Sequence, residues 1–363
     1  MIEDNIFSLG TKKLLTFKSH IETWLDSEAP TPIALEIHPT ERCNQHCPAC
    51  QAQYSLKLSD VRRRAKNGVD LNLTLLDTVW DKKPSGIILS GNTGDPLMHP
   101  EISTLLDLLR EKRIPTVIIT NGQNLNKTLS EQIIKTCQGV RISLDAHDAD
   151  LYTQTHGVKS DIWQMVLRNI QELVSLRNAL GLNEENCTIG IGYLTGNKTA
   201  YGMVPATKLA REIGVDHIQF RPFHYSDMNV EKELKMCEQF ETQNFRVFSS
   251  YQKYSRVSAP ARSYVTCHGA WFYTLIDARG DIYLCCHHVG NPNAFIGSLR
   301  DTSWSQLIAS DARRSKINSF NTSGCLPLCR LDSQNRLLES IQSSKVIPLA
   351  SLDSLSAKHA PFL

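Results

Sequence analysis

The sequence predicts an α/β fold, a partial (β/α)6 TIM-like barrel that is followed by a small C-terminal hairpin and helix unit. Between residues 33 and 220, short runs rich in Val and Ile alternate with longer helical patterns. Glycine and polar residues collect where those runs end, and a separate hairpin pattern follows residue 267. Alternation of strand and helix is typical of a parallel sheet. Six strands are fewer than a closed eight-stranded barrel contains.

The expected strands of the barrel are six short apolar runs. They are IALEI (33–37), GIILS (86–90), TVIIT (116–120), VRISL (140–144), TIGIG (188–192) and HIQFR (217–221). Between them, helices with one apolar face are expected from Pro100 onward, over 163–180 and over 204–213, because their apolar residues recur at helical spacing. These helices are expected to pack on the sheet.

After the barrel, FYTLI (272–276) and DIYLC (281–285) flank the turn at 277–280, which predicts a β-hairpin. A helix is expected at about 302–317. The whole chain is therefore expected to divide into five parts. They are an N-terminal extension (1–32), the barrel (33–224), a connecting helical segment (225–266), the hairpin unit (267–330) and a C-terminal tail (331–363).

Composition and charge exclude several classes of protein. The 363 residues carry 39 Lys and Arg against 37 Asp and Glu, a net charge of +2, and no basic stripe with interleaved aromatics is visible. Nucleic-acid binding therefore has little support. No apolar run approaches the roughly 18–20 residues of a membrane span. The N-terminus lacks the order of a secretory signal, so a cytoplasmic location is expected.

Eleven cysteines are the most informative feature of the composition. Cys43, Cys47 and Cys50 form a Cys-x3-Cys-x2-Cys run directly after the first expected strand. Three thiolates from one short loop can hold three corners of a cubane iron–sulfur cluster and leave the fourth iron open. A disulfide would leave one cysteine unpaired, and a zinc site would need a fourth ligand such as His46 or His38.

With this spacing and position, the sequence resembles the radical S-adenosylmethionine (SAM) enzymes, and the resemblance covers most of residues 33–224. The resemblance implies a [4Fe–4S] cluster whose open iron chelates the amino and carboxylate groups of SAM. It also implies that SAM is cleaved reductively to a 5′-deoxyadenosyl radical, which abstracts hydrogen from an unactivated carbon. An electron donor of the flavodoxin or ferredoxin class is a further expectation from the family.

The resemblance also suggests residues that contact SAM. Gly94, Asp95 and Pro96 align with the end of the family's Gly-Gly-Glu-Pro motif, so Asp95 is expected to face the SAM amino group. The alternative is that these residues form only a turn. Ser143, and secondly Asp145, are expected to point toward SAM from the fourth strand. Arg221 is expected to bind the SAM carboxylate or an anionic substrate group, with a surface salt bridge as the alternative.

The second cysteine group resembles the start of the SPASM domain or of its shortened form, twitch. Cys267 and Cys285 are separated as Cys-x12-Gly-x4-Cys, and Cys325 and Cys329 follow. Four cysteines imply one fully ligated auxiliary [4Fe–4S] cluster, which would carry electrons and bind no substrate. Structural zinc held by the same four cysteines is the alternative.

Cys286, next to Cys285, is surplus to either cluster. If its thiol faces the cavity, it is a candidate catalytic residue that returns a hydrogen atom to a substrate radical, which gives epimerisation. The alternative is a buried cysteine without a chemical role. His287, and His224 beyond the sixth strand, are candidate bases or substrate contacts, or else ordinary polar residues.

The expected function is a radical SAM enzyme that oxidises or epimerises a small polar substrate, such as a sugar, an aminocyclitol or a nucleotide-linked sugar. A single auxiliary cluster favours this interpretation, as do the roughly thirty residues before the first strand, which are too few for a peptide-leader-binding domain. One alternative is an enzyme that modifies peptides or proteins. Another is a non-enzymatic zinc protein on a barrel scaffold.

Overall fold

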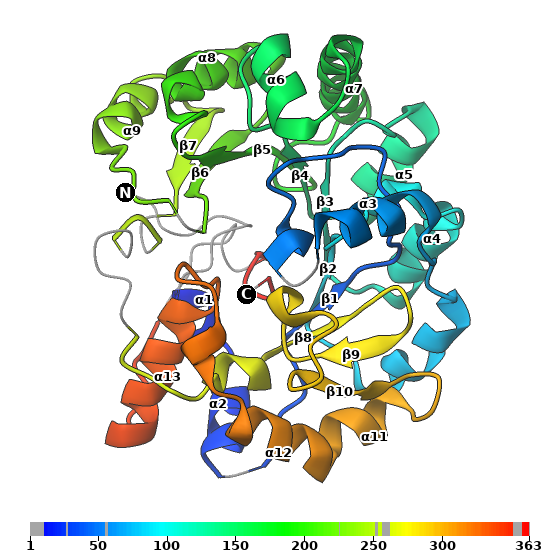
Figure 1. Cartoon of the computed structure of the whole chain (residues 1–363), viewed down its shortest axis with the longest axis vertical. Coiled ribbons are helices and arrows are strands. Elements are labelled where there is room, and N and C mark those ends of the chain that lie inside the picture. Colours follow the sequence, from blue (N-terminus) through cyan, green and yellow to red (C-terminus); the bar gives the residue numbers. More distant parts are fainter. Residues whose placement is uncertain are drawn as a thin grey trace.

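A computed structural model describes residues 11–26, 28–54, 57–224, 226–250, 253–255, 262–350 and 358–362. Its centre is one ten-stranded sheet with the order β10-β9-β8-β1-β2-β3-β4-β5-β6-β7. The sheet curves around the middle of the molecule, and helices cover its outer side (Figure 1). The α/β class and the partial barrel expected from the sequence are confirmed.

The six expected barrel strands are all present, and neighbours along the chain pair in parallel. Nearly every residue in them is buried, as expected for parallel strands covered on both faces. The strands are β1 (Ala34–Ile37), β2 (Gly86–Leu89), β3 (Thr116–Thr120), β4 (Gly139–Ser143), β5 (Thr188–Thr195) and β6 (His217–Pro222).

The connecting helices have one buried apolar face each. In the helix that follows Pro100, Ile102, Leu105, Leu106 and Leu109 are all buried, as their spacing predicts. The helices are α3 (Leu58–Asn67), α4 (Ile102–Lys112), α5 (Lys127–Thr136), α6 (Ala149–His156), α7 (Ser160–Ala179) and α8 (Met203–Ile213). Their packing against the sheet fixes the strand ends where polar residues gather.

The segment expected to be a helical connection contains a helix, α9 (Glu231–Glu238), but also a strand, β7 (Arg246–Ser249). Strand β7 pairs in parallel with β6 and forms one edge of the sheet. One of its four residues is buried, so it lacks the continuous apolar run that marks the inner strands. This edge position explains why the sequence pattern missed it.

The C-terminal unit continues the barrel sheet. Strands β8 (Tyr273–Ile276) and β9 (Asp281–Tyr283) form the expected hairpin, whose turn contains Gly280 at φ +77°. Strand β10 (Phe295–Ser298) extends it, and β8 pairs in parallel with β1. The hairpin of this unit is therefore attached to the first barrel strand by backbone hydrogen bonds.

The helix expected at 302–317 is two helices, α11 (Trp304–Ala309) and α12 (Asp311–Ser319). Ser310 ends the first and caps the second, because its side chain accepts a hydrogen bond from the Arg313 backbone N–H. A serine at this position offers the backbone an alternative to continuing the helix.

Both ends of the described chain pack on the barrel. At the N-terminal end lie α1 (Thr11–Leu15) and α2 (Lys18–Leu25), and the tail contains α13 (Asp332–Ser344). The last described residues return to the centre of the molecule (Figure 1), where Phe362 is 2% exposed. Lys13 Nζ donates to the Phe362 carbonyl at 3.3 Å. Among the described helices, none is long and apolar enough to cross a membrane.

Candidate functional site

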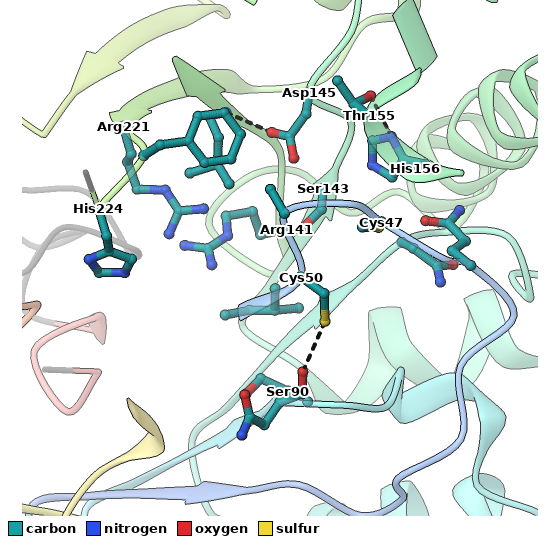
Figure 2. A pocket seen from close by; sticks show the side chains of 18 of the residues that line it. Cys47, Cys50, Ser90, Arg141, Ser143, Asp145, Thr155, His156, Arg221 and His224 are labelled. Atoms are coloured by element: carbon teal, nitrogen blue, oxygen red, sulfur yellow. Dashed lines mark hydrogen bonds between the residues drawn. The ribbon is translucent and has the colours of Figure 1, made fainter. Parts of the chain in front are cut away.

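A cavity of about 740 Å³ lies at the carboxyl ends of the barrel strands (Figure 2). This volume is within the roughly 300–1,000 Å³ typical of small-molecule sites. Alternate residues of neighbouring strands line its inner wall, among them Ile88 and Ser90 of β2 and its following turn, and Arg141 and Ser143 of β4. Side chains alternate across a strand, so this spacing identifies the inward face of the sheet.

The three cysteines of the first group converge on this cavity. Cys43, Cys47 and Cys50 all line it and are half-buried. Burial raises the pKa of Cys43 to about 12, and it raises the pKa of Cys47 well above its usual value, with added repulsion from the other two thiols. The three sulfurs are thus close enough to influence one another, and metal binding would have to displace their protons.

Helix α6 holds one side of the cysteine loop. Gln45 Nε2 donates to the Tyr152 hydroxyl at 2.9 Å, and the His46 N–H donates to the His156 carbonyl at 2.9 Å. Gly157 ends the helix at φ +64°, where a Cβ atom would lie 2.3 Å from the His46 carbonyl oxygen. The close approach of loop and helix therefore requires glycine.

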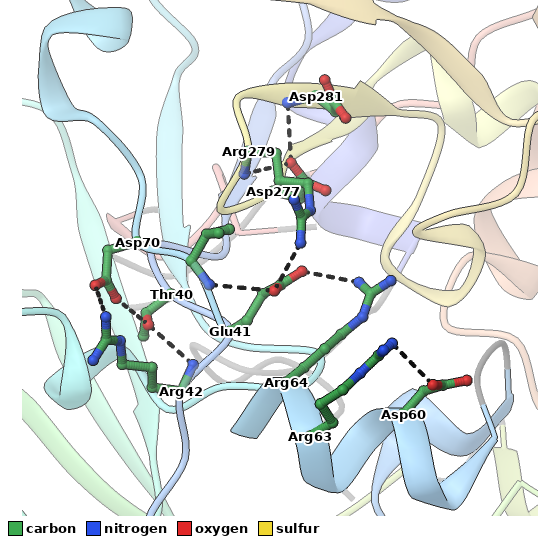
Figure 3. Close-up of polar contacts among 11 residues, drawn as sticks. Thr40, Glu41, Arg42, Asp60, Arg63, Arg64, Asp70, Asp277, Arg279 and Asp281 are labelled. Carbon is green, nitrogen blue, oxygen red and sulfur yellow. Dashed lines mark hydrogen bonds and ion pairs between the residues drawn. The ribbon is translucent and has the colours of Figure 1, made fainter. Parts of the chain in front are cut away.

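The base of the same loop is fixed by charged side chains from three regions (Figure 3). Glu41 accepts hydrogen bonds from Arg64 of α3 at 2.9 Å and from Arg279 of the hairpin turn at 3.2 Å. Asp70 accepts from the Thr40 hydroxyl at 2.6 Å and pairs with Arg42 at 2.9 Å. The hairpin unit and the cysteine loop therefore meet directly.

The end of β3 contacts the loop through amide side chains. Asn121 Nδ2 donates to Asn44 Oδ1 at 2.8 Å and lies 3.9 Å from Cys43 Sγ. Asn44 Nδ2 in turn donates to Asn124 Oδ1 at 2.9 Å. An N–H group directed at a cysteine sulfur stabilises negative charge on it, so Asn121 is placed to influence the ligand Cys43.

Asp95 lies in the cavity wall, but its carboxylate is already hydrogen-bonded within the protein. Thr120 Oγ1 lies 2.9 Å from both carboxylate oxygens, while the Asn121 and Leu97 N–H groups donate at 2.7 and 3.0 Å. Burial nevertheless raises the pKa of Asp95. Asp95 therefore ties the turn after β2 to the end of β3, and it adds negative charge to the wall of the cavity.

Gly94 and Pro96 place this turn against the cysteine loop. A Cβ atom on Gly94 would lie 2.0 Å from the Thr40 carbonyl oxygen, and the Asp95 N–H donates to the Arg42 carbonyl at 2.8 Å. Cys50 Sγ lies 3.5 Å from the Asn92 carbonyl oxygen. The turn after β2 and the cysteine loop thus form one continuous rim of the cavity.

Three further residues expected from the sequence also line the cavity. Ser143 ends β4, Arg221 is on β6, and Asp145 adopts a positive φ of +47° just beyond β4. The Leu194 N–H donates to Asp145 at 2.6 Å, and burial raises the pKa of this carboxyl to about 6. The charges of Arg221 and Arg141 oppose that rise. The alternative of a surface salt bridge for Arg221 is wrong, because this side chain faces the cavity and has no acid within ion-pair distance in the described chain.

The second cysteine group comes together from three separate segments. Cys267 precedes a short helical turn, Cys285 follows β9, and Cys325 and Cys329 lie before α13. Burial raises the pKa of Cys285 well above its usual value, with added repulsion from the other three thiols. The proximity of all four is thus consistent with the predicted ligand set.

Several protein groups already contact these sulfurs. Asn335 Nδ2 donates to Cys267 Sγ at 3.7 Å, and the Leu331 N–H donates to Cys329 Sγ at 3.4 Å. His288 Nε2 lies 3.4 Å from Cys325 Sγ. Hydrogen bonds to ligand sulfurs are typical of iron–sulfur sites, where they tune the cluster.

Cys286 is buried, with 3% exposure, yet it belongs to the cavity lining. Arg330 Nη1 lies 3.8 Å from its sulfur and 2.5 Å from Glu36 Oε2. Glu36 also accepts from Ser90, Tyr273 and, at 2.9 Å, His38. This buried group, Glu36 with its partners, lies between the two cysteine sites.

Within the described ranges, no group of three or more His, Cys, Asp or Glu side chains is arranged so that it could hold a metal ion.

Sequence reasoning missed Glu36, Arg141, Lys253 and Arg330, all of which line the cavity. A signal for two of them was present, because Glu36 and Arg141 are charged residues inside otherwise apolar strands. Such a residue is rarely buried without a partner or a function. Lys253 and Arg330 lie in irregular segments, where no periodic pattern shows which side faces inward.

Comparison with protein families gives two matches. The radical SAM superfamily matches residues 37–197, and an iron–sulfur cluster-binding domain, SPASM, matches residues 267–331. Among curated proteins, an S-adenosyl-L-methionine-dependent tRNA 4-demethylwyosine synthase of Methanocaldococcus jannaschii is 29% identical over 105 residues. That match covers 27% of this chain and 32% of the relative, about a third of its length.

Solved structures share the fold over most of the chain. SuiB of Streptococcus suis bound to S-adenosylmethionine aligns with a TM-score of 0.61 at 16% identity, over 90% of this chain and 79% of SuiB. The enzyme anSMEcpe with bound AdoMet aligns with a TM-score of 0.58 at 16% identity, over 91% of this chain and 99% of that one. The two domain matches imply a SAM-binding [4Fe–4S] cluster, an auxiliary iron–sulfur cluster and SAM as cofactors.

Proposed function

We propose that the chain, which matches the radical SAM superfamily over residues 37–197 and the SPASM cluster-binding domain over residues 267–331, is a radical SAM enzyme that oxidises or epimerises a small polar substrate. The observation that carries the proposal is the continuity of the cavity. One space of about 740 Å³ is lined by Cys43, Cys47 and Cys50 at one side and by Cys286, next to the auxiliary site, at the other. A molecule between them would lie within reach of both.

The three-cysteine loop, the turn after β2 and the end of β4 would hold the first cluster and SAM. When bound, these cofactors supply a 5′-deoxyadenosyl radical that abstracts a hydrogen atom from the substrate. Carbonyl groups of the turn at 91–94 would receive the SAM ammonium, with the charge of Asp95 behind them. Ser143 and Asp145 would contact SAM from the opposite wall.

Cys286 is proposed as the catalytic residue if the reaction is an epimerisation. Its S–H bond would break as a new C–H bond forms on the other face of the substrate radical. One electron and one proton from an external reductant of the flavodoxin or ferredoxin class would then restore the thiol. The neighbouring Arg330 and Tyr273 hold the sulfur at the cavity wall.

For an oxidation, the substrate radical would instead lose one electron to the auxiliary cluster and one proton to a base. Cys267, Cys285, Cys325 and Cys329 would hold that cluster with no open position, which suits electron transfer. His287 lies on the cavity side of the same segment and is a candidate for the base. A two-electron oxidation of a carbinol carbon yields a carbonyl.

Peptide modification is the second candidate. SuiB, which shares the fold, has also been solved bound to its precursor peptide SuiA. A peptide would need an open path for its backbone on both sides of the modified residue. The many buried polar and charged groups in the cavity instead suit a compact polar molecule.

Product analysis in deuterated water tests the proposal. Anaerobically reconstituted protein would be reduced and screened against sugars, aminocyclitols and nucleotide-linked sugars for 5′-deoxyadenosine release. Mass spectrometry of the product is expected to show solvent deuterium at carbon for epimerisation, or a loss of two mass units for oxidation. Turnover of peptides, with none of the small molecules accepted, would favour the second candidate.

A further inference from the structure

Two cationic side chains face the cavity without an acidic partner. Arg221 of β6 and Lys253, in a short helical turn, both line it and are half-buried. Among the described residues, neither has a carboxylate oxygen within 4.0 Å. Arg221 Nε is also buried and has no hydrogen-bond partner within the described ranges. Leaving a buried donor unsatisfied is unfavourable, and more so for a charged group.

The two cations lie near each other. Burial lowers the pKa of Lys253 to about 7, and the charge of Arg221 is the largest neighbouring contribution to that shift. Figure 2 shows the Arg221 guanidinium directed into the same part of the cavity as that of Arg141. Like charges in a water-poor cavity repel, so the arrangement is stabilised when an anion binds between them.

Other cations of the cavity have partners that explain them. Arg330 pairs with Glu36 at 2.5 Å. Arg141 lies beside Ser143, near the proposed SAM contacts, and the charges of Glu36 and, less strongly, Asp145 act on it. Asp145 acts on Arg221 as well, but it forms no ion pair with that side chain. Arg141 therefore offers the SAM carboxylate a cation that is independent of Arg221 and Lys253.

The auxiliary site does not account for the pair either. Its thiols accept hydrogen bonds from Asn335, Leu331 and His288, as described above. The charge of Cys329 acts on Lys253, but less than that of Arg221 does. The pKa of Arg221 is determined mainly by burial, which lowers it, and by the charge of Asp145, which raises it.

Uncharged hydrogen-bonding groups surround the two cations. His224 follows β6 and lies edge to face with His287, with ring centroids 4.8 Å apart. Both line the cavity, next to Cys286. Burial lowers the pKa of His224 to about 2, so its imidazole is neutral at physiological pH. Neutral imidazoles are suited to hydrogen bonds with hydroxyl groups.

The number of charges selects the class of anion. A bound anion would favour the charged form of Lys253. A carboxylate would then neutralise one of the two cations, whereas a phosphate monoester carries about −1.5 to −2 at pH 7. Arginine binds phosphate oxygens through two parallel N–H groups, and lysine adds a point charge.

We propose, on the basis of the proposed function, that Arg221 and Lys253 bind the phosphate group of a phosphorylated small substrate. The phosphate would anchor the molecule at the β6 side of the cavity. Its hydroxyl-bearing carbons would then extend past His224 and His287 toward Cys286 and the SAM side. The substrate class is thus a phosphorylated polyol or sugar.

Titration calorimetry with inorganic phosphate tests this assignment on reconstituted, SAM-loaded protein at low salt. The wild type is expected to bind one phosphate. Lys253→Met and Arg221→Gln are each expected to weaken that binding at least tenfold, while Lys253→Arg retains most of it. Lys198→Met is the matched control, because it removes a positive charge from the exposed rim of the same cavity and is expected to leave phosphate binding unchanged.

Three outcomes would overturn the proposal. They are an absence of saturable phosphate binding to the wild type, equal binding by the wild type and both variants, and mutual exclusion of phosphate and SAM. The last would assign the cations to the SAM carboxylate. Iron content and 5′-deoxyadenosine release are measured on each preparation, since a wild type that fails to cleave SAM contradicts the proposed function itself. Intact SAM cleavage without phosphate binding contradicts this inference alone.

Discussion

The two cysteine sites reach similar ligand sets by different routes. Cys43, Cys47 and Cys50 come from one loop of eight residues, whereas Cys267 and Cys329 are 62 positions apart. The first three are half-buried and open on the cavity, while Cys267 and Cys285 are buried. Neighbouring side chains and backbone also donate to sulfurs of the second group. The first site is therefore local and open, and the second depends on tertiary structure and is enclosed.

This difference suggests that the two sites have different roles, one in binding a ligand and the other in transferring electrons. An open site at the rim of a cavity can accept a ligand on its metal, as SAM requires. An enclosed site whose four thiolates occupy every iron can exchange only electrons. The pairing of β8 with β1 places the hairpin of the enclosed site against the barrel, and Cys286, next to the ligand candidate Cys285, lines the cavity.

The largest expected effect comes from removing the open site. Changing Cys43, Cys47 and Cys50 together to Ala is expected to abolish 5′-deoxyadenosine release and to remove about four irons per chain. Quantification of the nucleoside by liquid chromatography and of iron by colorimetry would check this. Continued release from the triple variant would contradict the assignment of these cysteines.

Removing cysteines of the enclosed site should separate SAM cleavage from product formation. Cys267→Ala with Cys285→Ala is expected to lose about four irons while SAM cleavage continues. If the reaction is an oxidation, product formation should stop, because the substrate radical has lost its electron acceptor. An unimpaired product yield would remove the proposed electron-transfer role. Cys237→Ala, in a buried cysteine of α9 far from both groups in sequence, is the matched control for loss of a buried thiol.

Between the two sites, Glu36→Gln leaves the buried Arg330 without its carboxylate. Breaking a buried pair in this way costs about 3–5 kcal/mol, which denaturant unfolding would measure. Glu131→Gln, in an exposed pair with Lys135, should have no measurable effect. A loss no larger than that of the control would contradict the proposed importance of the buried pair.

The same variant predicts a pH dependence. The charge of Arg330 holds the pKa of Glu36 below its usual 4.5 in the folded protein, against the opposing effect of burial. A carboxyl with a lowered folded pKa adds stability above its unfolded pKa and loses it as pH falls. The difference in free energy of unfolding between wild type and Glu36→Gln should therefore be largest at pH 7 and should decrease below about pH 4.5.

The smallest expected effect tests Asp95 at the open site. Asp95→Asn keeps the shape of the turn but removes the charge behind the SAM ammonium and one acceptor for the Asn121 N–H. Because Asp95 would act on the ammonium only through its charge, behind the carbonyl groups of the turn, the loss should be about 1 kcal/mol, and SAM affinity should fall about fivefold. Equilibrium binding of SAM would measure this. Unchanged affinity would confine Asp95 to a structural role.

Local sequence was enough to predict what depends on local chemistry. The six barrel strands and the buried face of α4 follow from the pattern of apolar residues, because that pattern shows which residues of a parallel strand or an amphipathic helix are buried. The cysteine loop was equally visible, since its three ligands lie within eight residues. The hairpin at 272–285 needed only its two apolar runs and the turn between them.

Tertiary structure decided the features that require distant segments to meet. Sequence could not show that β8 pairs with β1, that Glu36 pairs with Arg330 294 positions away, or that Lys253 and Arg221 line one cavity. Strand β7 was missed because an edge strand keeps polar residues on its exposed side. The chain's composition thus determined which chemistry is available. The curvature of the sheet determined which side chains share one cavity. Burial and charge depend on distance in space, so positions along the chain do not show them.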